Sequence, residues 1–213
     1  MQGFLFDLDG TLVDTAIDMI DSLKLLAAEN NIDINPDYNE YKELITFGSR
    51  AIVTSIFGHL DDQSIQNLQQ RYLEIYQKNL SAGSGLFDGV GAFIEKLDEN
   101  KTPWGIVTNK PSYLAQPLVN SLSQLSNCKV LIGGDTTSQS KPHPEPINRA
   151  IEALQIDPKI SWYIGDAKTD IQAANAANIN SAVALWGYLS KQDTPENWQA
   201  DVMLNHAQDM LEL

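Results

Sequence analysis

Strand-like and helix-like segments alternate through the later part of this chain, and that alternation restricts the fold more than any other feature. Short apolar runs at 105–108, 130–132, 162–164 and 182–184 predict strands. Segments with helical spacing of apolar residues predict helices at 90–97, 112–125, 145–154, 170–177 and 206–211. Gly3 to Leu8 is a further apolar run and predicts a buried strand. Such alternation is typical of a parallel sheet with helices on both faces. The sequence therefore predicts an α/β fold with a doubly wound parallel sheet.

A purely helical segment interrupts this alternation. From about Ala16 to Leu80 the apolar residues recur at helical spacing, and no strand-like alternation is present. Pro36, Gly48 and Gly58 break the segment into several helices. The small residues at 81–85 predict a flexible hinge. We therefore expect an inserted helical cap over residues 15–82 and an α/β core domain formed by residues 1–14 and 83–213.

The charge balance excludes several classes of partner. The chain has 14 Lys and Arg against 28 Asp and Glu, which gives a formal net charge of −14. Because no basic cluster offsets this charge, we expect neither nucleic acid nor a membrane surface as a partner. The same charge repels an anionic substrate. Any phosphate site must therefore be made locally positive by a metal ion, a lysine and backbone amides.

Several features predict a cytoplasmic protein. No apolar run approaches the ~20 residues needed to cross a bilayer. Asp7 and Asp9 stand where the apolar part of a secretory signal would lie. Cys128 is the single cysteine, so no internal disulfide can form, and its apolar neighbours predict a buried thiol. The sequence does not specify an oligomeric state.

Polar residues follow four predicted elements of the α/β part. In an open α/β sheet, ligands bind beyond the carboxyl ends of the strands. The four segments are Asp7-Leu8-Asp9-Gly10-Thr11, Thr108-Asn109-Lys110, Lys141-Pro142 and Gly165-Asp166-Ala167-Lys168-Thr169-Asp170. Each alone has an ordinary interpretation, such as a polar turn, a surface lysine or a helix N-cap. Together they supply carboxylates for a cation, donors for phosphate oxygens and a lysine, and their order and spacing predict one phosphate-handling site.

With these four segments the chain resembles the haloacid dehalogenase superfamily, whose core is a Rossmann-like doubly wound sheet. The resemblance covers essentially the whole chain, including a helical cap in the position used by the phosphoglycolate phosphatase branch. Similarity to that branch extends to residues 104–111, 141–146 and 187–188. Residues 197–201 are similar to those of phosphatases that act on N-acetylmuramate 6-phosphate.

The resemblance implies a Mg²⁺-dependent phosphatase that works through an aspartyl-phosphate intermediate. Asp7 would attack phosphorus, and Asp9 would protonate the leaving oxygen and later take a proton from water. Mg²⁺ would be held by Asp7, Asp166 and the backbone carbonyl of Asp9. Asp170 would steady that coordination shell without binding the metal directly. The substrate would be a small phosphorylated metabolite.

The resemblance also implies a phosphate-binding set. Thr108 and the amide of Asn109 would bind phosphate oxygens, and Lys141 would neutralise charge on Asp7 and the phosphoryl group. Arg50, in the helical insertion, is a candidate for binding the non-phosphate end of the substrate, although a solvated helix arginine has the same sequence pattern. His143 either lines the site entrance or is a loop residue ahead of a proline-started helix.

Alternative functions remain within and outside the superfamily. A dehalogenase does not need the proton-transfer carboxylate of Asp9. A sugar phosphomutase shares all four segments and the helical cap, whereas Thr11 is the residue expected in a hydrolase. An inactive binding module would have lost the nucleophile or a metal ligand, and neither is missing. The sequence leaves phosphoglycolate, a sugar phosphate and N-acetylmuramate 6-phosphate open as substrates.

Overall fold

A computed structural model describes residues 1–213 and divides the chain into two compact units. The core unit contains Met1–Asp14 and Leu86–Leu213, and the helical unit contains Thr15–Gly85. The helical unit therefore ends slightly later than the boundary expected at residue 82. The reason is local, because Asp18 accepts hydrogen bonds from the backbone N–H groups of Gly83 (2.7 Å) and Ser84 (3.1 Å), which hold this segment against the helix that carries Asp18.

The core unit contains a six-stranded sheet in the order β5-β4-β1-β6-β7-β8, and every pairing is parallel. The strands are β1 (Phe4–Phe6), β4 (Trp104–Val107), β5 (Leu131–Ile132), β6 (Trp162–Gly165), β7 (Asn180–Ala184) and β8 (Val202–Leu204). Strand β1 is central, since Phe4 is in register with Trp104 on one side and Trp162 on the other. The strand order runs outward in both directions from β1. The predicted doubly wound parallel sheet is confirmed.

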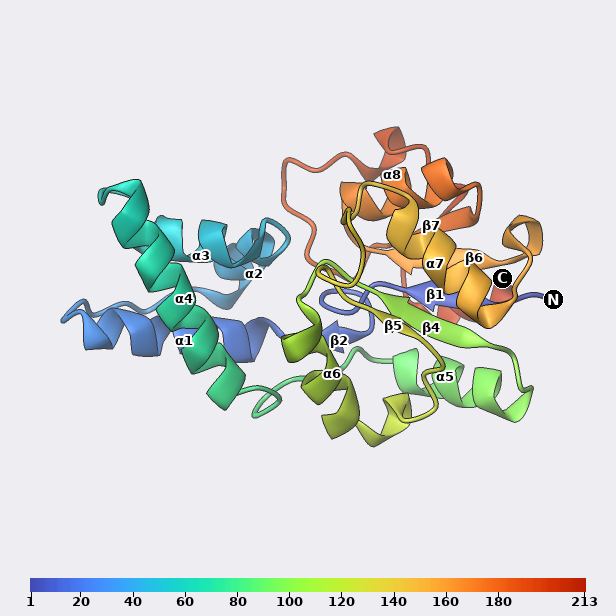
Figure 1. The fold of residues 1–213 in the computed structure, drawn as a ribbon, viewed down its shortest axis with the longest axis horizontal. Coiled ribbons are helices and arrows are strands. Elements are labelled where there is room, and N and C mark those ends of the chain that lie inside the picture. Colours follow the sequence, from blue (N-terminus) through green and yellow to red (C-terminus); the bar gives the residue numbers. More distant parts are fainter. The chain divides into compact units, whose positions relative to one another are not determined.

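Helices cover both faces of this sheet (Figure 1). They are α5 (Val90–Glu99) and α6 (Ser112–Ser121) on one face, and α7 (Glu145–Leu154) and α8 (Lys168–Ala177) on the other. The alternation within β1 explains this arrangement. Phe4 and Phe6 contact the ring of Phe93 on α5, whereas Leu5 packs in the opposite cluster with Ile147 of α7 and Ala173 of α8. A strand buried on both faces needs apolar residues at every position.

The helical unit contains α1 (Ala16–Glu29), α2 (Tyr38–Ile45), α3 (Gly48–Phe57) and α4 (Asp62–Lys78). The helix boundaries follow from capping side chains, because Asp37 accepts hydrogen bonds from the first turn of α2 and Asp61 from that of α4. Tyr72 of α4 is buried and donates a hydrogen bond to the Met19 carbonyl of α1. None of the helices in the protein is both long and apolar enough to span a membrane.

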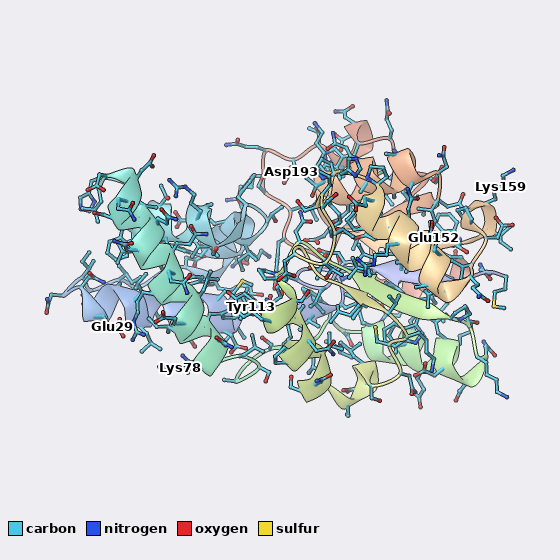
Figure 2. All side chains as sticks on the ribbon, in the orientation of Figure 1. Glu29, Lys78, Tyr113, Glu152, Lys159 and Asp193 are labelled. Carbon is cyan, nitrogen blue, oxygen red and sulfur yellow. The ribbon has the colours of Figure 1, made fainter.

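Charged side chains lie on the surface of both units (Figure 2). Glu29 and Lys78 are exposed on the helical unit, and Glu152 and Lys159 are exposed on the core unit. The charge that dominates the composition is therefore mostly solvated. A few charged groups are buried instead: Asp18 in the helical unit, and Asp7, Lys110, Lys141, Asp166 and Asp170 in the core unit.

Some local predictions were wrong. The expected final helix is the 3₁₀ helix η4 (Ala207–Glu212), and the helix expected over 112–125 ends at Ser121, where Leu122 turns to an extended conformation before η1 (Ser123–Leu125). Strand β8 and the two-stranded sheet of β2 (Val13–Asp14) and β3 (Gly85–Leu86) were not predicted. The remaining 3₁₀ helices are η2 (Pro158–Ile160) and η3 (Pro195–Asn197).

Cys128 is half-buried and not fully buried as expected. Its Sγ lies 3.1 Å from the carbonyl oxygen of Val130, and burial raises the pKa of the thiol to about 11. The thiol is therefore protonated at neutral pH and unreactive as a nucleophile.

Candidate active site

The carboxyl ends of three neighbouring strands meet at one edge of the sheet. Asp7 follows β1, Thr108 follows β4, and Asp166 follows β6. Because these strands are adjacent and parallel, the residues after them share the same edge. Lys141 comes from the loop between β5 and α7, and Asp170 from the first turn of α8. The structure thus brings the four predicted segments together.

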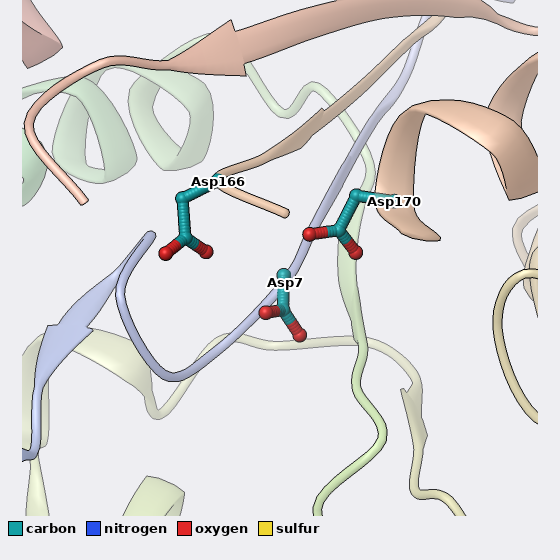
Figure 3. A group of neighbouring side chains, drawn as sticks. All are labelled: Asp7, Asp166 and Asp170. Atoms are coloured by element: carbon teal, nitrogen blue, oxygen red, sulfur yellow. The ribbon is translucent and has the colours of Figure 1, made fainter. Parts of the chain in front are cut away.

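Three carboxylates form the centre of this edge. Asp7, Asp166 and Asp170 each place a carboxylate oxygen within 4.8 Å of those of the other two, and Figure 3 shows the three side chains beside one another. Their exposed fractions are 8%, 3% and 0%, respectively. Like charges this close and this far from water repel strongly, so the cluster requires positive charge or protons nearby.

Lys141 supplies part of that positive charge. Its Nζ lies 2.6 Å from Asp170 Oδ1 and 2.8 Å from Asp7 Oδ1, and 4% of the residue is exposed. The same nitrogen lies 2.9 Å from the hydroxyl of Tyr163 and 3.0 Å from the carbonyl oxygen of Val107. A buried ammonium in contact with two carboxylates is a fixed positive point beside Asp7.

Burial and these contacts set the pKa values of the ionisable groups at the site. Burial alone would lower the pKa of Lys141, but Asp170 and Asp7 outweigh it and hold that pKa above its usual range. Burial raises the pKa of Asp7 to about 6, against the opposing effect of Lys141. Burial, reinforced by Asp7 and Asp170, also raises the pKa of Asp166 well above its usual range. One lysine does not balance three carboxylates, so the cluster still favours a further cation.

The three carboxylates are not equivalent in their contacts with the protein. Asp170 has both oxygens engaged, because Oδ1 accepts from Lys141 and Tyr163 while Oδ2 accepts from the Ala167 amide. Asp7 Oδ1 accepts from Lys141, whereas Oδ2 accepts no hydrogen bond from the protein and keeps contact with solvent. Asp7 is therefore the member with an oxygen free to react or to bind a ligand.

The carboxylate of Asp166 is held by hydrogen bonds to both of its oxygens. Its Oδ1 accepts from the hydroxyl of Thr11 at 3.0 Å, and its Oδ2 accepts from the backbone N–H of Tyr188 at 2.8 Å. Two glycines make this approach possible. A Cβ at Gly10, where φ is +86°, would lie 2.2 Å from Asp166 Oδ2, and a Cβ at Gly187 would lie 2.3 Å from Asp166 Cβ.

The donor set fits a hard divalent cation. Carboxylate oxygens are the side-chain ligands that Mg²⁺ and Ca²⁺ prefer, and Asp7 and Asp166 present them from the ends of two adjacent strands. A cation there would offset the repulsion that raises the pKa of both groups. The acidic cluster is thus able to hold a metal ion.

Asn109 has a second role that the sequence pattern did not reveal. Its Oδ1 accepts from the backbone N–H of Lys141 and its Nδ2 donates to the carbonyl of Lys141, both at 3.0 Å. This reciprocal pair connects the loop after β4 with the loop that carries Lys141. Thr108 is buried, and its hydroxyl accepts from the backbone N–H of Lys110 at 3.2 Å.

Two further residues near the carboxylates were not singled out from the sequence. Tyr163 was interpreted only as part of an apolar strand, yet its hydroxyl oxygen lies 2.8 Å from the carbonyl oxygen of Val107 and 3.0 Å from Asp170 Oδ1. Lys110 lies within a predicted segment but was given no role, and its Nζ contacts both oxygens of Asp9 at 2.9 and 3.1 Å. The sequence signal that could have identified Lys110 is a lysine inside the segment that follows β4.

Arg50 and His143, the two candidates outside the four segments, have partners close to them in the fold. Arg50 Nη2 donates to Asp62 Oδ1 at 2.7 Å on the surface of the helical unit, where half of the Arg50 side chain is exposed. His143 Nδ1 accepts from the backbone N–H of Glu145 at 3.2 Å, at the start of α7. The His143 contact agrees with a loop residue ahead of a helix.

Loss of Lys141 is expected to destabilise the metal-free protein. Lys141→Met removes the buried partner of Asp7 and Asp170, so the unfolding free energy at pH 7 in chelator should fall by about 3–5 kcal/mol, the usual effect of breaking a buried ion pair. Urea denaturation measures this change. Lys159→Met is the matched control, because Lys159 is exposed, and it should leave stability essentially unchanged. A similar small effect of both variants would contradict the structural role of Lys141.

Comparison with known proteins reveals close relatives. A family model described as haloacid dehalogenase-like hydrolase matches residues 4–184. The chain is 43% identical over 201 residues to a phosphoglycolate phosphatase of Xylella fastidiosa, covering 94% of this chain and 87% of the relative. It is 33% identical over 214 residues to an N-acetylmuramic acid 6-phosphate phosphatase of Pseudomonas aeruginosa, covering 100% and 94%.

The fold has a close counterpart among solved structures. The structure of a protein from Haemophilus somnus, described as a predicted phosphoglycolate phosphatase, superposes with a TM-score of 0.88 at 24% identity. The match covers 100% of this chain and 97% of the other. At that identity the likeness shows a shared fold.

Proposed function

We propose a function from the premise that this chain belongs to the haloacid dehalogenase-like hydrolase family and is a phosphatase. It hydrolyses the monoester of a small phosphorylated metabolite in the cytoplasm, with Mg²⁺ as cofactor and Asp7 as nucleophile. The observation that carries this proposal is the buried cluster in which Lys141 Nζ lies 2.8 Å from Asp7, with Asp166 and Asp170 beside it.

The reaction divides into two displacements at phosphorus. Asp7 attacks with the oxygen that the protein leaves uncommitted, and an aspartyl-phosphate replaces the bond to the leaving oxygen. Asp9 gives its proton to that oxygen as the alcohol departs. Asp9 then takes a proton from the water that attacks the aspartyl-phosphate, which releases inorganic phosphate and restores Asp7.

The surrounding residues neutralise negative charge at the site and orient the phosphoryl group. Lys141 offsets negative charge on Asp7 and on the phosphoryl group, and Thr108 with the backbone amide of Asn109 binds phosphate oxygens. Asp7, Asp166 and the backbone carbonyl of Asp9 would hold Mg²⁺, which supplies further neutralisation of the phosphate charge. The contacts of Asp170 support a role in positioning, because its two oxygens are engaged by Lys141, Tyr163 and Ala167.

A carboxylated phosphate ester is the proposed substrate class. Phosphoglycolate is the first candidate, since the Xylella fastidiosa relative carries that name, and N-acetylmuramate 6-phosphate is the second. Both compounds carry a carboxylate in addition to an alkyl phosphate. Phosphate release from these two esters, a neutral sugar phosphate and p-nitrophenyl phosphate tests the proposal. Absence of phosphate release from every compound in the presence of Mg²⁺ would overturn it.

Arg50 is proposed to bind the substrate carboxylate. An exposed ion pair such as Arg50–Asp62 contributes little stability, so the guanidinium is readily available to a better partner. Arg50→Ala should lower kcat/KM on phosphoglycolate by roughly tenfold to a hundredfold, the usual value of a charged hydrogen-bonded contact. Turnover of p-nitrophenyl phosphate, which has no carboxylate, should change little.

Asp62→Asn provides the matched control for this prediction. It removes the charge of the surface partner and leaves the guanidinium in place, so activity on phosphoglycolate should be retained. If Arg50→Ala lowers kcat/KM equally on both substrates, Arg50 supports the helical unit and does not bind substrate.

A further inference from the structure

Lys110 holds the carboxylate of Asp9 through both of its oxygens. Its Nζ lies 2.9 Å from Oδ1 and 3.1 Å from Oδ2, so one ammonium spans the carboxylate. The contact is largely shielded from water, with 3% of the Lys110 side chain and 14% of the Asp9 side chain exposed. A two-point contact restricts the rotation of the carboxylate in a way that a single hydrogen bond does not.

Both backbones that meet in this contact are rigidly held. Asp9 forms an isolated bridge with Val13, and the next residue, Gly10, donates from its backbone N–H to the carbonyl of Val13. The backbone N–H of Lys110 donates to the hydroxyl of Thr108, and its carbonyl accepts from the amide of Gly134. The backbone from which the Lys110 side chain extends is therefore set by the loop after β4, and the ammonium meets Asp9 without any contribution from substrate.

The cost of burying Lys110 argues that the pair is specific. A buried ammonium is unfavourable unless a carboxylate compensates it, and Asp9 provides that charge at hydrogen-bonding distance. If Lys110 is removed, the carboxylate of Asp9 loses this two-point restraint. Transfer of a proton to or from a reacting oxygen requires the carboxyl group within hydrogen-bond reach at the moment of bond cleavage.

We propose that Lys110 is a positioning residue that fixes Asp9 for proton transfer to the leaving oxygen. The proposal rests on the function proposed above, in which Asp9 carries that proton. The proton moves from the Asp9 carboxyl group to the ester oxygen as the P–O bond breaks and the bond from Asp7 to phosphorus forms. Lys110 acts only through Asp9 and touches neither the phosphoryl group nor the leaving alcohol.

The leaving group provides a test that a purely structural role would not pass. An ester of a basic alcohol or phenol needs a proton to depart, whereas p-nitrophenolate departs readily as an anion. Phenyl phosphate and p-nitrophenyl phosphate are nearly the same size, and neither carries a carboxylate. The value of kcat/KM covers only the steps up to release of the alcohol, so it isolates the transfer in which Asp9 donates its proton.

The experiment compares Lys110→Met, Lys110→Arg and wild type on both aryl esters in Mg²⁺. Lys110→Met should lower kcat/KM on phenyl phosphate by roughly tenfold to a hundredfold, part of the usual effect of a general acid, and on p-nitrophenyl phosphate by less than about threefold. Lys110→Arg retains a cationic donor and should recover most of the lost rate on phenyl phosphate. Circular dichroism and melting temperature establish that each variant is folded.

A double-mutant cycle with Asp9→Asn completes the test. The amide introduced by that substitution cannot transfer a proton, so adding Lys110→Met to Asp9→Asn should cost less than about threefold more on phenyl phosphate. Equal losses on the two aryl esters, or a full additional loss in the Asp9→Asn background, would overturn the proposal and assign Lys110 to the phosphoryl group or to the fold. Failure of the proposed function is distinguishable, because wild type would then release phosphate from neither aryl ester and from none of the phosphorylated metabolites.

Discussion

Asp7→Asn is expected to abolish turnover while leaving the fold intact. The amide keeps the shape of the carboxylate but cannot attack phosphorus, so no aspartyl-phosphate forms. The rate should fall by at least roughly 10⁴-fold, as for loss of a covalent nucleophile in other enzymes. Release of inorganic phosphate from phosphoglycolate and p-nitrophenyl phosphate measures the change. A variant that keeps more than a few per cent of the wild-type rate with an unchanged circular dichroism spectrum would exclude Asp7 as the nucleophile.

Asp9→Asn is the control that separates the two aspartates. A general acid–base group typically increases the reaction rate by roughly 10²–10⁴-fold. Asp9→Asn should therefore be slower than wild type by that factor but should still form the covalent intermediate. Mass spectrometry of acid-quenched enzyme should therefore find a phosphate adduct on the Asp7 peptide in wild type and in Asp9→Asn, and none in Asp7→Asn. An adduct in Asp7→Asn would place the nucleophile elsewhere.

Removal of divalent cations is expected to reduce activity to background. The carboxylates of Asp7 and Asp166 lie close together, and Lys141 is the nearby lysine that offsets part of their charge. Without a metal ion, the negative charge that is not offset repels an anionic ester. Excess chelator should abolish turnover and Mg²⁺ should restore it. Ca²⁺ should restore little, because it takes more oxygen ligands at longer distances and would engage both oxygens of Asp7. Full activity in chelator would contradict a metal-dependent mechanism.

The pH dependence of metal binding follows from Asp7. Burial raises the pKa of this group to about 6, so the metal-free folded state retains a proton that the unfolded chain releases near pH 4. The stability that this proton provides is present below about pH 4 and is lost as pH rises through about 6. Ionised Asp7 is the form that binds a cation. Mg²⁺ should therefore stabilise the protein more at pH 7 than at pH 5.

Thermal unfolding with and without Mg²⁺ at the two pH values measures this difference. At a free Mg²⁺ concentration a hundredfold above its dissociation constant, the stabilisation is about 2.7 kcal/mol. Asp7→Asn should weaken the pH dependence of the Mg²⁺ effect, and the raised pKa of Asp166 should account for the part that remains. An equal shift in melting temperature at both pH values in wild type would mean that the ion binds away from Asp7.

The central geometry of the candidate site was predictable because it depends on topology. Asp7, Thr108 and Asp166 each follow an apolar run, and parallel neighbouring strands end at one edge whatever their exact lengths. The family resemblance then supplied an expected role for each residue. The sequence could not show that Asp170 has both oxygens engaged by the protein, because its partners Tyr163 and Lys141 are distant in the chain or appear as core residues.

Pairings between distant residues account for what was missed at the site. Lys110 and Asp9 lie in two different segments, and no periodicity relates them. The reciprocal contact of Asn109 with Lys141 likewise joins two loops that meet only in the folded protein. A residue type and its neighbours in sequence indicate that a group is polar, but they do not indicate which partner saturates it.

Short elements account for most errors in the fold. Strand β8 has only three residues, too short an apolar run to identify a strand from sequence, and at the edge of the sheet it leaves Met203 48% exposed. The final segment has helical spacing but is held as a 3₁₀ helix, in which the Asp209 carboxylate accepts from the amides of Asn205 and His206. Periodicity over so few residues does not distinguish the two helix types.

The central place of β1 also determines the order in which the chain can fold. Both partners of Phe4, Trp104 and Trp162, are synthesised long after it, with the helical unit in between. The contacts within that unit reach a sequence separation of 53 residues, between Met19 and Tyr72, whereas both partners of β1 lie farther along the chain than that, and pairings across a longer loop form more slowly. The helical unit can thus fold on the ribosome while β1 is still unpaired along both edges. The slow step of folding is then the closure of β4 and β6 around β1, and until it occurs the apolar segment Phe4-Leu5-Phe6 is open to aggregation.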